Sequence, residues 1–246
     1  MSVDAPMQPR AAIWHDVECG AYAGDLGLWV ELAREAGGPV LELGGGTGRV
    51  ALALAETGYE VTAVERDRAL LAELRRRAAD ADHAIEAVEG DAREFNLDRR
   101  YALALAPMQL VQLLGDEADR RRMLACVAAH LRPGGRFALA LVAGELDGPG
   151  SYRPLPDVRE LDGWIYSSLP LETRAVSGAI EVRRLRQLVS PAGELTDELD
   201  VTRLARLSPA QLEEEAATCG LRPAGRRQIA STPDHVGSTA VLLERG

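Results

Sequence analysis

The sequence has 246 residues, 46% of them hydrophobic, which is enough to bury the core of one α/β domain with an elaboration. No apolar run approaches the ~18 residues of a membrane span, and the first residues lack the basic start and apolar run of a signal peptide, so we expect a cytoplasmic protein without a membrane partner. The formal net charge of −10, with no lysine in the chain, argues against a nucleic-acid partner, which needs a positive protein face.

Short apolar runs alternate with helical segments from about residue 38, a rhythm typical of βαβ units and a parallel sheet. An amphipathic helix ending near Ala36 precedes them. Strands are predicted over 39–43, 60–65, 84–88, 101–106 and 136–142, and helices over 49–57, 68–79 and 117–131. The arginine runs 75–77 and 120–122 fall inside these helices, and we interpret them as solvated helix faces rather than as a binding patch.

The rhythm changes after Gly144. Residues 145–160 hold several glycines and prolines and are predicted to be a loop. Strands are then predicted over 164–171, 180–189 and 196–207, which indicates an inserted antiparallel sheet rather than another βαβ unit. A helix that starts with a capping box at Ser208 ends at Gly220, and strands over 226–229 and 241–244 close the main sheet as a hairpin.

A glycine-rich segment, residues 42–48, joins the first predicted strand to the first helix, at the edge where ligands bind in doubly wound sheets. Its glycines let the backbone turn tightly and approach a ligand closely. Glu65 ends the second strand about 20 residues later, where an acid can accept hydrogen bonds from ribose hydroxyls. A solvated glutamate at a strand end is the competing interpretation, but the spacing from the loop favours ribose binding.

The order of glycines in this loop distinguishes two classes of enzyme. Dinucleotide-dependent oxidoreductases prefer GxGxxG, which would place a third glycine at Arg49. Here the loop has Gly44, Gly46 and Gly48, preceded by Glu42. This pattern resembles the class I methyltransferase family, whose first motif is an acidic residue followed by GxGxG.

The resemblance continues along residues 38–143 and 208–246. Glu65 matches the family's ribose-binding acid, and Gly90-Asp91-Ala92 is similar to its adenine-contacting motif, with Asp91 near the adenine amino group. Residues 106–109 match the segment that lines the methionine end and the substrate, and residues 131–135 match the turn before the fifth strand. Gly45 stands where many members have cysteine or alanine, a tolerated departure.

The resemblance implies S-adenosylmethionine as cofactor and a Rossmann-like α/β fold. We expect a seven-stranded, mostly parallel sheet with helices on both faces, and an antiparallel insertion after the fifth strand. The chain then divides into an N-terminal lid and helix (1–37), a cofactor-binding core (38–143 and 208–246) and the insertion (144–207). The cofactor-binding residues that it implies are Tyr22, Glu42, Gly44, Gly46, Gly48, Glu65, Arg66, Asp91, Ala92, Pro107 and Met108.

The N-terminal segment around Tyr22 resembles a Tyr-rich segment that folds over the cofactor in small-molecule methyltransferases. The competing interpretation is that Tyr22 and Trp14 pack on the core and anchor the helix there. Tyr22, His15 and His235 are candidate catalytic residues, although His235 also suits an ordinary surface loop. Candidate substrate contacts are Trp14, Gln109, Gln112, Trp164 and Tyr166. The last two belong to the insertion, which would serve as a lid or as a homodimer surface, with strand-face packing as the alternative.

Methyl transfer is an in-line displacement, so the protein must mainly place the nucleophile on the axis of the methyl–sulfur bond. A general base is needed only where the acceptor must first lose a proton. No cysteine or histidine spacing indicates a metal. We therefore expect methylation of a nitrogen or oxygen of a small molecule or short peptide, as in natural-product tailoring. The alternatives are an NAD-dependent oxidoreductase and a non-catalytic partner protein that binds S-adenosylmethionine.

Overall fold

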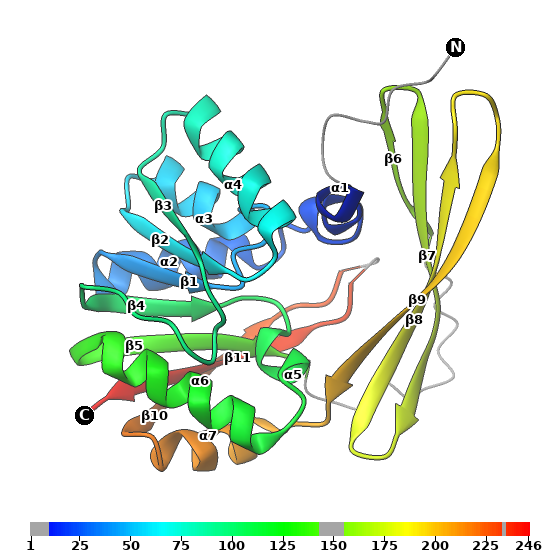
Figure 1. Cartoon of the computed structure of the whole chain (residues 1–246). Coiled ribbons are helices and arrows are strands. Elements are labelled where there is room, and N and C mark those ends of the chain that lie inside the picture. The colour runs from blue at the N-terminus through cyan, green and yellow to red at the C-terminus, as the bar shows by residue number, and fades with distance from the viewer. Residues whose placement is uncertain (1–9, 143–154, 233–234) are drawn as a thin grey trace.

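The computed structural model describes residues 10–142, 155–232 and 235–246. Seven strands form the main sheet, in the order β10-β11-β5-β4-β1-β2-β3 (Figure 1). They are β1 (Val40–Leu43), β2 (Val61–Glu65), β3 (Ile85–Glu89), β4 (Tyr101–Ala106), β5 (Leu131–Leu141), β10 (Leu221–Ile229) and β11 (Ser238–Arg245). The first five are parallel, whereas β11 runs antiparallel to both of its neighbours. The predicted mostly parallel sheet with a closing hairpin is confirmed.

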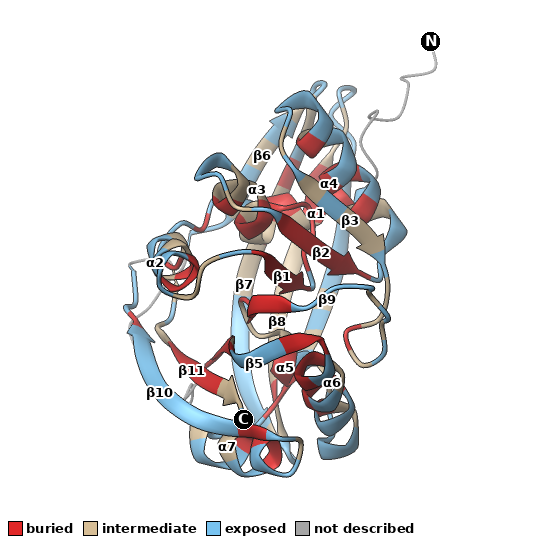
Figure 2. Cartoon of the chain, turned by 90° about the vertical axis from the view of Figure 1, so that its left-hand side faces the viewer, coloured by how far each residue is buried: buried red, intermediate tan, exposed pale blue. Residues whose placement is uncertain are grey.

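Helices cover both faces of this sheet. They are α2 (Leu26–Ala36), α3 (Arg49–Glu56), α4 (Arg68–Asp80), α5 (Leu110–Leu113), α6 (Glu117–His130) and α7 (Pro209–Ala217). Successive strand residues point to opposite faces, so Val40 packs with the cluster that includes α2, α3 and α4, whereas Leu41 and Leu43 pack with α6 and α7. The central strands are therefore buried on both faces, while most of β10 is exposed (Figure 2).

Four strands form the separate antiparallel sheet of the insertion, in the order β6-β7-β8-β9. They are β6 (Asp157–Leu161), β7 (Trp164–Val176), β8 (Ala179–Val189) and β9 (Leu195–Ala205). The loop predicted over 145–160 was wrong at its end, because β6 begins at Asp157; residues 143–154 lie outside the described residues. In β6 the inward side chains of Asp157 and Arg159 are charged and ion-paired, while the apolar Val158 faces outward. The usual alternation of apolar inward and polar outward residues is therefore reversed, and the sequence pattern does not indicate a strand here.

The N-terminal segment is helical earlier than the sequence indicated. An α-helix, α1 (Arg10–His15), continues directly into a π-helix, η1 (Asp16–Gly20), and the two lie between the core and the insertion (Figure 1). A π-helix is rare and has no simple sequence pattern, so it was not predicted. Among the described residues, no helix is long and apolar enough to cross a membrane.

The arginine runs are not uniformly solvated, so that interpretation was wrong for one member of each. Arg120 is 8% exposed and forms a two-point ion pair with Glu215 on α7, at 2.5 and 2.8 Å. Arg77 binds Asp16 of η1 and Glu73 of its own helix. Helix-forming arginines on an apparent polar face can therefore be the residues that join one helix to another.

Candidate active site

The glycine loop lies at the carboxyl end of β1 and begins α3. Gly44, Gly46 and Gly48 have φ values of +66°, +55° and +99°, a region that side chains other than glycine rarely adopt. The backbone N–H of Gly46 donates to Oε2 of Glu65 at 3.0 Å, and Oε1 of Glu65 accepts from the N–H of Asp67 at 2.8 Å. The acid at the end of β2 is thus fixed against the loop with one hydrogen bond on each oxygen.

Glu42 is a buried carboxyl beneath this loop. It is 2% exposed, and its Oε2 has no hydrogen-bond partner among the described residues. Burial raises the pKa of Glu42 to about 8, against the opposing effect of the nearby Arg49 guanidinium. An unsatisfied buried oxygen next to a glycine cradle fits a site completed by a ligand with a hydrogen-bond donor.

Asp91 follows β3 and is held as a carboxylate by Arg93, a residue that the sequence did not single out. Arg93 donates to both oxygens of Asp91, at 2.9 and 2.6 Å, and to Asp119 at 2.5 Å. The hydrogen bonds from Arg93 lower the pKa of Asp91 to about 2. Asp91 is therefore fixed in orientation beside the buried Ala92, whereas Arg66 after β2 is exposed.

The segment after β4 has an unusual backbone. Met108 has a φ of +56°, which is strained for a residue with a side chain and is typical of functional sites. Pro107 before it is buried, and Gln109 after it is partly buried. Gln112 is fully buried, and its carboxamide binds the backbone of Val142 twice and of Ala205 once. These three bonds connect Gln112 to the end of β5 and to the end of the insertion, and its predicted contact with substrate stays a prediction.

Tyr22 and His235 come from opposite ends of the chain and meet at this site. Their ring centroids are 4.5 Å apart. Arg49, at the start of α3, lies 5.3 Å from the Tyr22 ring and donates to the Tyr22 carbonyl at 2.8 Å. Arg49 also forms a two-point ion pair with the buried Asp25, at 2.5 and 2.8 Å. Arg49, which stands where a dinucleotide enzyme has its third glycine, therefore anchors the N-terminal segment to the start of α3.

The aromatic residues of the insertion pack on α1. Tyr166 is 1% exposed, and its ring meets that of Trp14 edge-on at 5.2 Å. Trp164 packs against the same cluster, with its indole nitrogen buried and without a hydrogen-bond partner among the described residues. Trp14 therefore packs on the insertion and not on the main core, and Tyr166 packs on α1 through the inner face of its strand.

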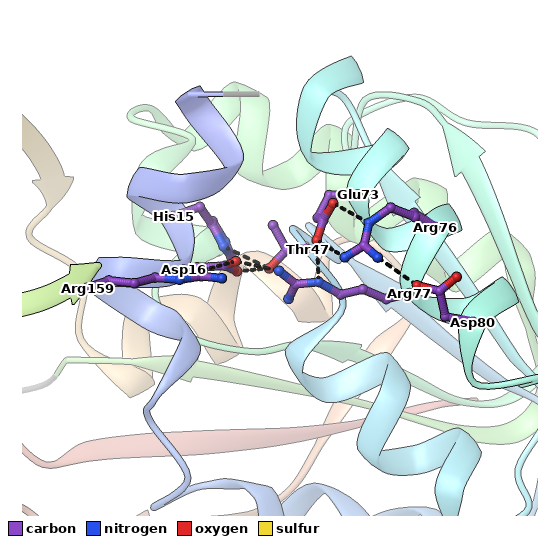
Figure 3. A network of polar contacts seen from close by, with 8 residues as sticks. All are labelled: His15, Asp16, Thr47, Glu73, Arg76, Arg77, Asp80 and Arg159. Carbon is purple, nitrogen blue, oxygen red and sulfur yellow. Dashed lines mark hydrogen bonds and ion pairs between the residues drawn. The ribbon is translucent and has the colours of Figure 1, made fainter. Parts of the chain in front are cut away.

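Asp16 joins η1 to three other elements (Figure 3). It accepts hydrogen bonds from Thr47 of the glycine loop at 2.7 Å, from Arg77 of α4, and from Arg159 of β6 at 2.7 Å. Burial alone would raise the pKa of Asp16, but the hydrogen bonds from Arg77, Thr47 and Arg159 lower it to about 2. Two residues along, Glu18 binds Arg186 at 2.7 and 2.8 Å and Ser168 at 2.8 Å, which fastens η1 to the insertion.

A shallow surface hollow of about 340 Å³ lies elsewhere, at the amino-terminal ends of β2 and β3. It is lined by residues such as Thr62 and His83, on the edge of the sheet opposite to the glycine loop. Ligands of doubly wound sheets bind at the carboxyl edge, so this hollow is not the candidate site.

Known proteins are similar to the chain in the sequence of part of the core and in the fold. A family model described as a methyltransferase domain matches residues 40–135. The chain is 37% identical over 111 residues to cypemycin N-terminal methyltransferase from Streptomyces sp, a match that spans 45% of this chain and only 44% of that protein. It is 30% identical to the glycopeptide N-methyltransferase MtfA, solved with S-adenosyl-L-methionine, with 92% of this chain and 96% of that chain covered and a TM-score of 0.61.

A third relative shares the fold at lower identity. It is CalS10 from Micromonospora echinaspora, an amino pentose methyltransferase solved with S-adenosylmethionine bound, at 19% identity and a TM-score of 0.75 over 95% of this chain and 97% of that chain. The sheet order, the glycine loop and its acidic partner define a nucleoside-binding methyltransferase fold. The chain belongs to the class I S-adenosylmethionine-dependent methyltransferase family. The glycine cradle, Glu65 and the unsatisfied Glu42 oxygen all fit the cofactor of that family.

Proposed function

We propose that this protein transfers a methyl group from S-adenosylmethionine to an amino nitrogen of a small molecule or short peptide. The observation that carries the proposal is the glycine loop hydrogen-bonded to Glu65, an arrangement suited to the adenosine part of the methyl donor. The relatives support nitrogen over oxygen as the acceptor, because cypemycin N-terminal methyltransferase and the glycopeptide enzyme MtfA are both named for N-methylation. They also support a role in natural-product tailoring, and we place the protein in the cytoplasm.

The chemistry requires little covalent participation by the protein. The cofactor supplies a methyl group on a positively charged sulfur. The nitrogen lone pair of the acceptor forms a bond to the methyl carbon while the carbon–sulfur bond breaks, and the electron pair of that bond stays on sulfur. Holding the two reactants in line can supply ~7–11 kcal/mol of the barrier. A protonated amine has no lone pair, so its proton must leave before the attack.

We propose His235 as the acceptor of that proton, with Tyr22 stacked beside it. An imidazole is suited to proton transfer near neutral pH. The division of labour would be a lid over 1–37, a cofactor-binding core over 38–143 and 208–246, and an insertion over 144–207. Trp164 stays a candidate substrate contact because its indole nitrogen has no hydrogen-bond partner among the described residues, and Gln109 stays one because it follows the strained Met108.

A substrate screen tests the proposed function. The protein is incubated with S-adenosylmethionine and a panel of peptide α-amines, amino sugars, phenols and carboxylic acids, and S-adenosylhomocysteine and methylated product are measured by mass spectrometry. We expect turnover with amines and none with phenols or acids. Tight binding of S-adenosylmethionine without turnover of any acceptor would instead support a non-catalytic partner protein.

We also propose that the outer face of the insertion pairs with a second copy of the chain. Pairing aligns two rows of apolar residues across β7, β8 and β9 on the face turned away from α1. The rows are Ile165, Val189 and Leu195, and Leu169, Leu185 and Leu199. Leu195 is 58% exposed and Leu199 47% exposed, and exposed apolar rows of this kind mark interaction surfaces.

Light scattering on the purified protein tests the dimer. The wild type should have the mass of a dimer, and Leu199→Arg should convert it to a monomer. Thr196→Arg, on the same strand but the opposite face, is the matched control and should stay dimeric. A wild-type protein that is monomeric at every concentration would overturn this proposal and leave the catalytic one intact.

A further inference from the structure

The imidazole of His15 lies directly on the glycine loop. A Cβ atom added to Gly46 would stand 2.5 Å from His15 Nε2 and 2.6 Å from Cε1, closer than real Cβ contacts come. The residue must therefore be glycine both for its positive φ and because the imidazole occupies the space beside it. The same glycine donates its N–H to Glu65, so His15 and the ribose-binding acid border one residue of the cofactor cradle.

The hydrogen bonds around Thr47 determine which nitrogen of His15 carries the proton. The Thr47 hydroxyl has one hydrogen to donate, and its Oγ1 lies 2.7 Å from Oδ1 of Asp16. Asp16 is ionised and can only accept, because Arg77 and Arg159 hold it as a carboxylate. The Thr47 hydrogen therefore points to Asp16, and the 3.3 Å contact between Thr47 Oγ1 and His15 Nδ1 needs an N–H on the imidazole.

This arrangement leaves the other nitrogen as an acceptor. Burial lowers the pKa of His15, against the opposing effects of Asp16 and Glu65, while Arg49 and Arg77 lower it further. The ring is therefore neutral at neutral pH, with its proton on Nδ1 and a lone pair on Nε2. Nε2 forms no hydrogen bond with the described residues, and Figure 3 shows the ring directed toward the loop residue Thr47.

We propose that His15 is a cofactor-binding residue whose Nε2 accepts a hydrogen bond from S-adenosylmethionine, and that Thr47 and Asp16 position it by fixing the proton on Nδ1. The donor is either a ribose hydroxyl or the α-ammonium group of the cofactor, because an unprotonated ring nitrogen can accept a hydrogen bond from each. The inference rests on cofactor binding by the proposed enzyme and not on the identity of the methyl acceptor. A protein that binds the cofactor but methylates no amine would leave it standing.

Calorimetry with two ligands tests the assignment without turnover. S-adenosylhomocysteine has the ribose and the amino-acid group, whereas 5′-methylthioadenosine has the ribose alone. His15→Ala should weaken S-adenosylhomocysteine binding about tenfold, the value of one hydrogen bond. An equal loss for 5′-methylthioadenosine identifies the ribose as donor, and an unchanged affinity for it identifies the ammonium. Changes below about twofold for both ligands would overturn the proposal.

Conservative variants separate positioning from simple damage to the fold. His15→Gln places an amide oxygen near the Nε2 position and should restore part of the affinity. Thr47→Val should weaken binding and Thr47→Ser should restore it, because only the hydroxyl fixes the tautomer. His83→Ala, at the opposite edge of the sheet, is the matched control and should bind like the wild type. If His83→Ala and His15→Ala lower affinity equally, the effect is not specific and the proposal fails.

The pH dependence of binding gives an independent readout. Protonation turns Nε2 into a donor, so S-adenosylhomocysteine affinity should fall as pH drops below 6.5, and this step should be missing in His15→Ala. The charged groups that act on the ring are Asp16 from η1, Arg77 from α4, Glu65 from β2 and Arg49 from α3. An identical pH step in His15→Ala would contradict the assignment.

Discussion

Replacement of Asp16 by alanine should be one of the most damaging single changes in the N-terminal segment. Asp16 is 8% exposed, and its loss leaves Arg77 and Arg159 without their shared carboxylate. Removing one partner of a buried ion pair costs about 3–5 kcal/mol. Arg77 keeps its contact with Glu73, and 36% of the Arg159 side chain is exposed, so we expect a smaller loss of about 2–3 kcal/mol in the free energy of unfolding.

The pKa of Asp16 gives a second estimate of this loss. It falls from 3.8 to about 2 on folding, which corresponds to about 2 kcal/mol. Because the folded pKa is depressed, this stabilisation is fully present above pH 3.8 and is lost as pH falls through about 2. Urea unfolding at several pH values should therefore show a constant gap between wild type and Asp16→Ala near neutrality that closes in acid.

Asp80→Ala is the matched control for this experiment. Asp80 belongs to the outer end of the same network, where it binds Arg76 at 2.6 Å with 64% of its side chain exposed (Figure 3). An exposed pair contributes under about 1 kcal/mol. Equal destabilisation by Asp16→Ala and Asp80→Ala, or a gap that does not change with pH, would refute the reasoning.

Three further predictions follow from the buried groups. Burial raises the pKa of Glu42 to about 8. The contribution of its protonated form to the free energy of unfolding is therefore complete below its ordinary pKa of 4.5 and is lost as pH rises through about 8. Thermal unfolding at about pH 6 and about pH 9 should show a smaller alkaline loss of stability in Glu42→Gln than in wild type. Gly46→Ala should weaken S-adenosylhomocysteine binding about tenfold by calorimetry. The double variant with His15→Ala should lose less than the two single losses combined, because the added methyl group and the imidazole compete for the same space, whereas additive losses would contradict the clash. Arg120→Ala should lower the free energy of unfolding by about 3–5 kcal/mol and Arg121→Ala by under about 1 kcal/mol; similar urea midpoints would contradict this.

The core of the fold could be predicted because each of its signals is local. The apolar run 40–43, the glycines after it and the capping box at Ser208 each depend on residues within one element. The same holds for the glycine loop, which directly follows that apolar run, and for Glu65, which ends the next strand; the structure brings the two together. Strand β6 was missed because two of its inward-facing, partly buried side chains are charged, and α5 was missed because it is too short to have a periodic pattern.

The positioning of the site could not be predicted, because it depends on charge pairs between distant segments. Asp16 is 31 residues from Thr47, 61 from Arg77 and 143 from Arg159. Any of several arginines could have been its partner, and no pattern in one sequence selects among them. Yet Asp16 connects the insertion to the glycine loop, through Arg159 on one side and Thr47 on the other. A substrate that displaced Arg159 would remove one of the groups that hold the Asp16 carboxylate in place. Because Asp16 orients the Thr47 hydroxyl and Thr47 contacts His15, the imidazole would then be held less firmly beside the glycine loop. Affinity for S-adenosylhomocysteine should therefore fall in Arg159→Ala, although Arg159 lies on the insertion; an unchanged affinity would show that the insertion and the cofactor site act independently.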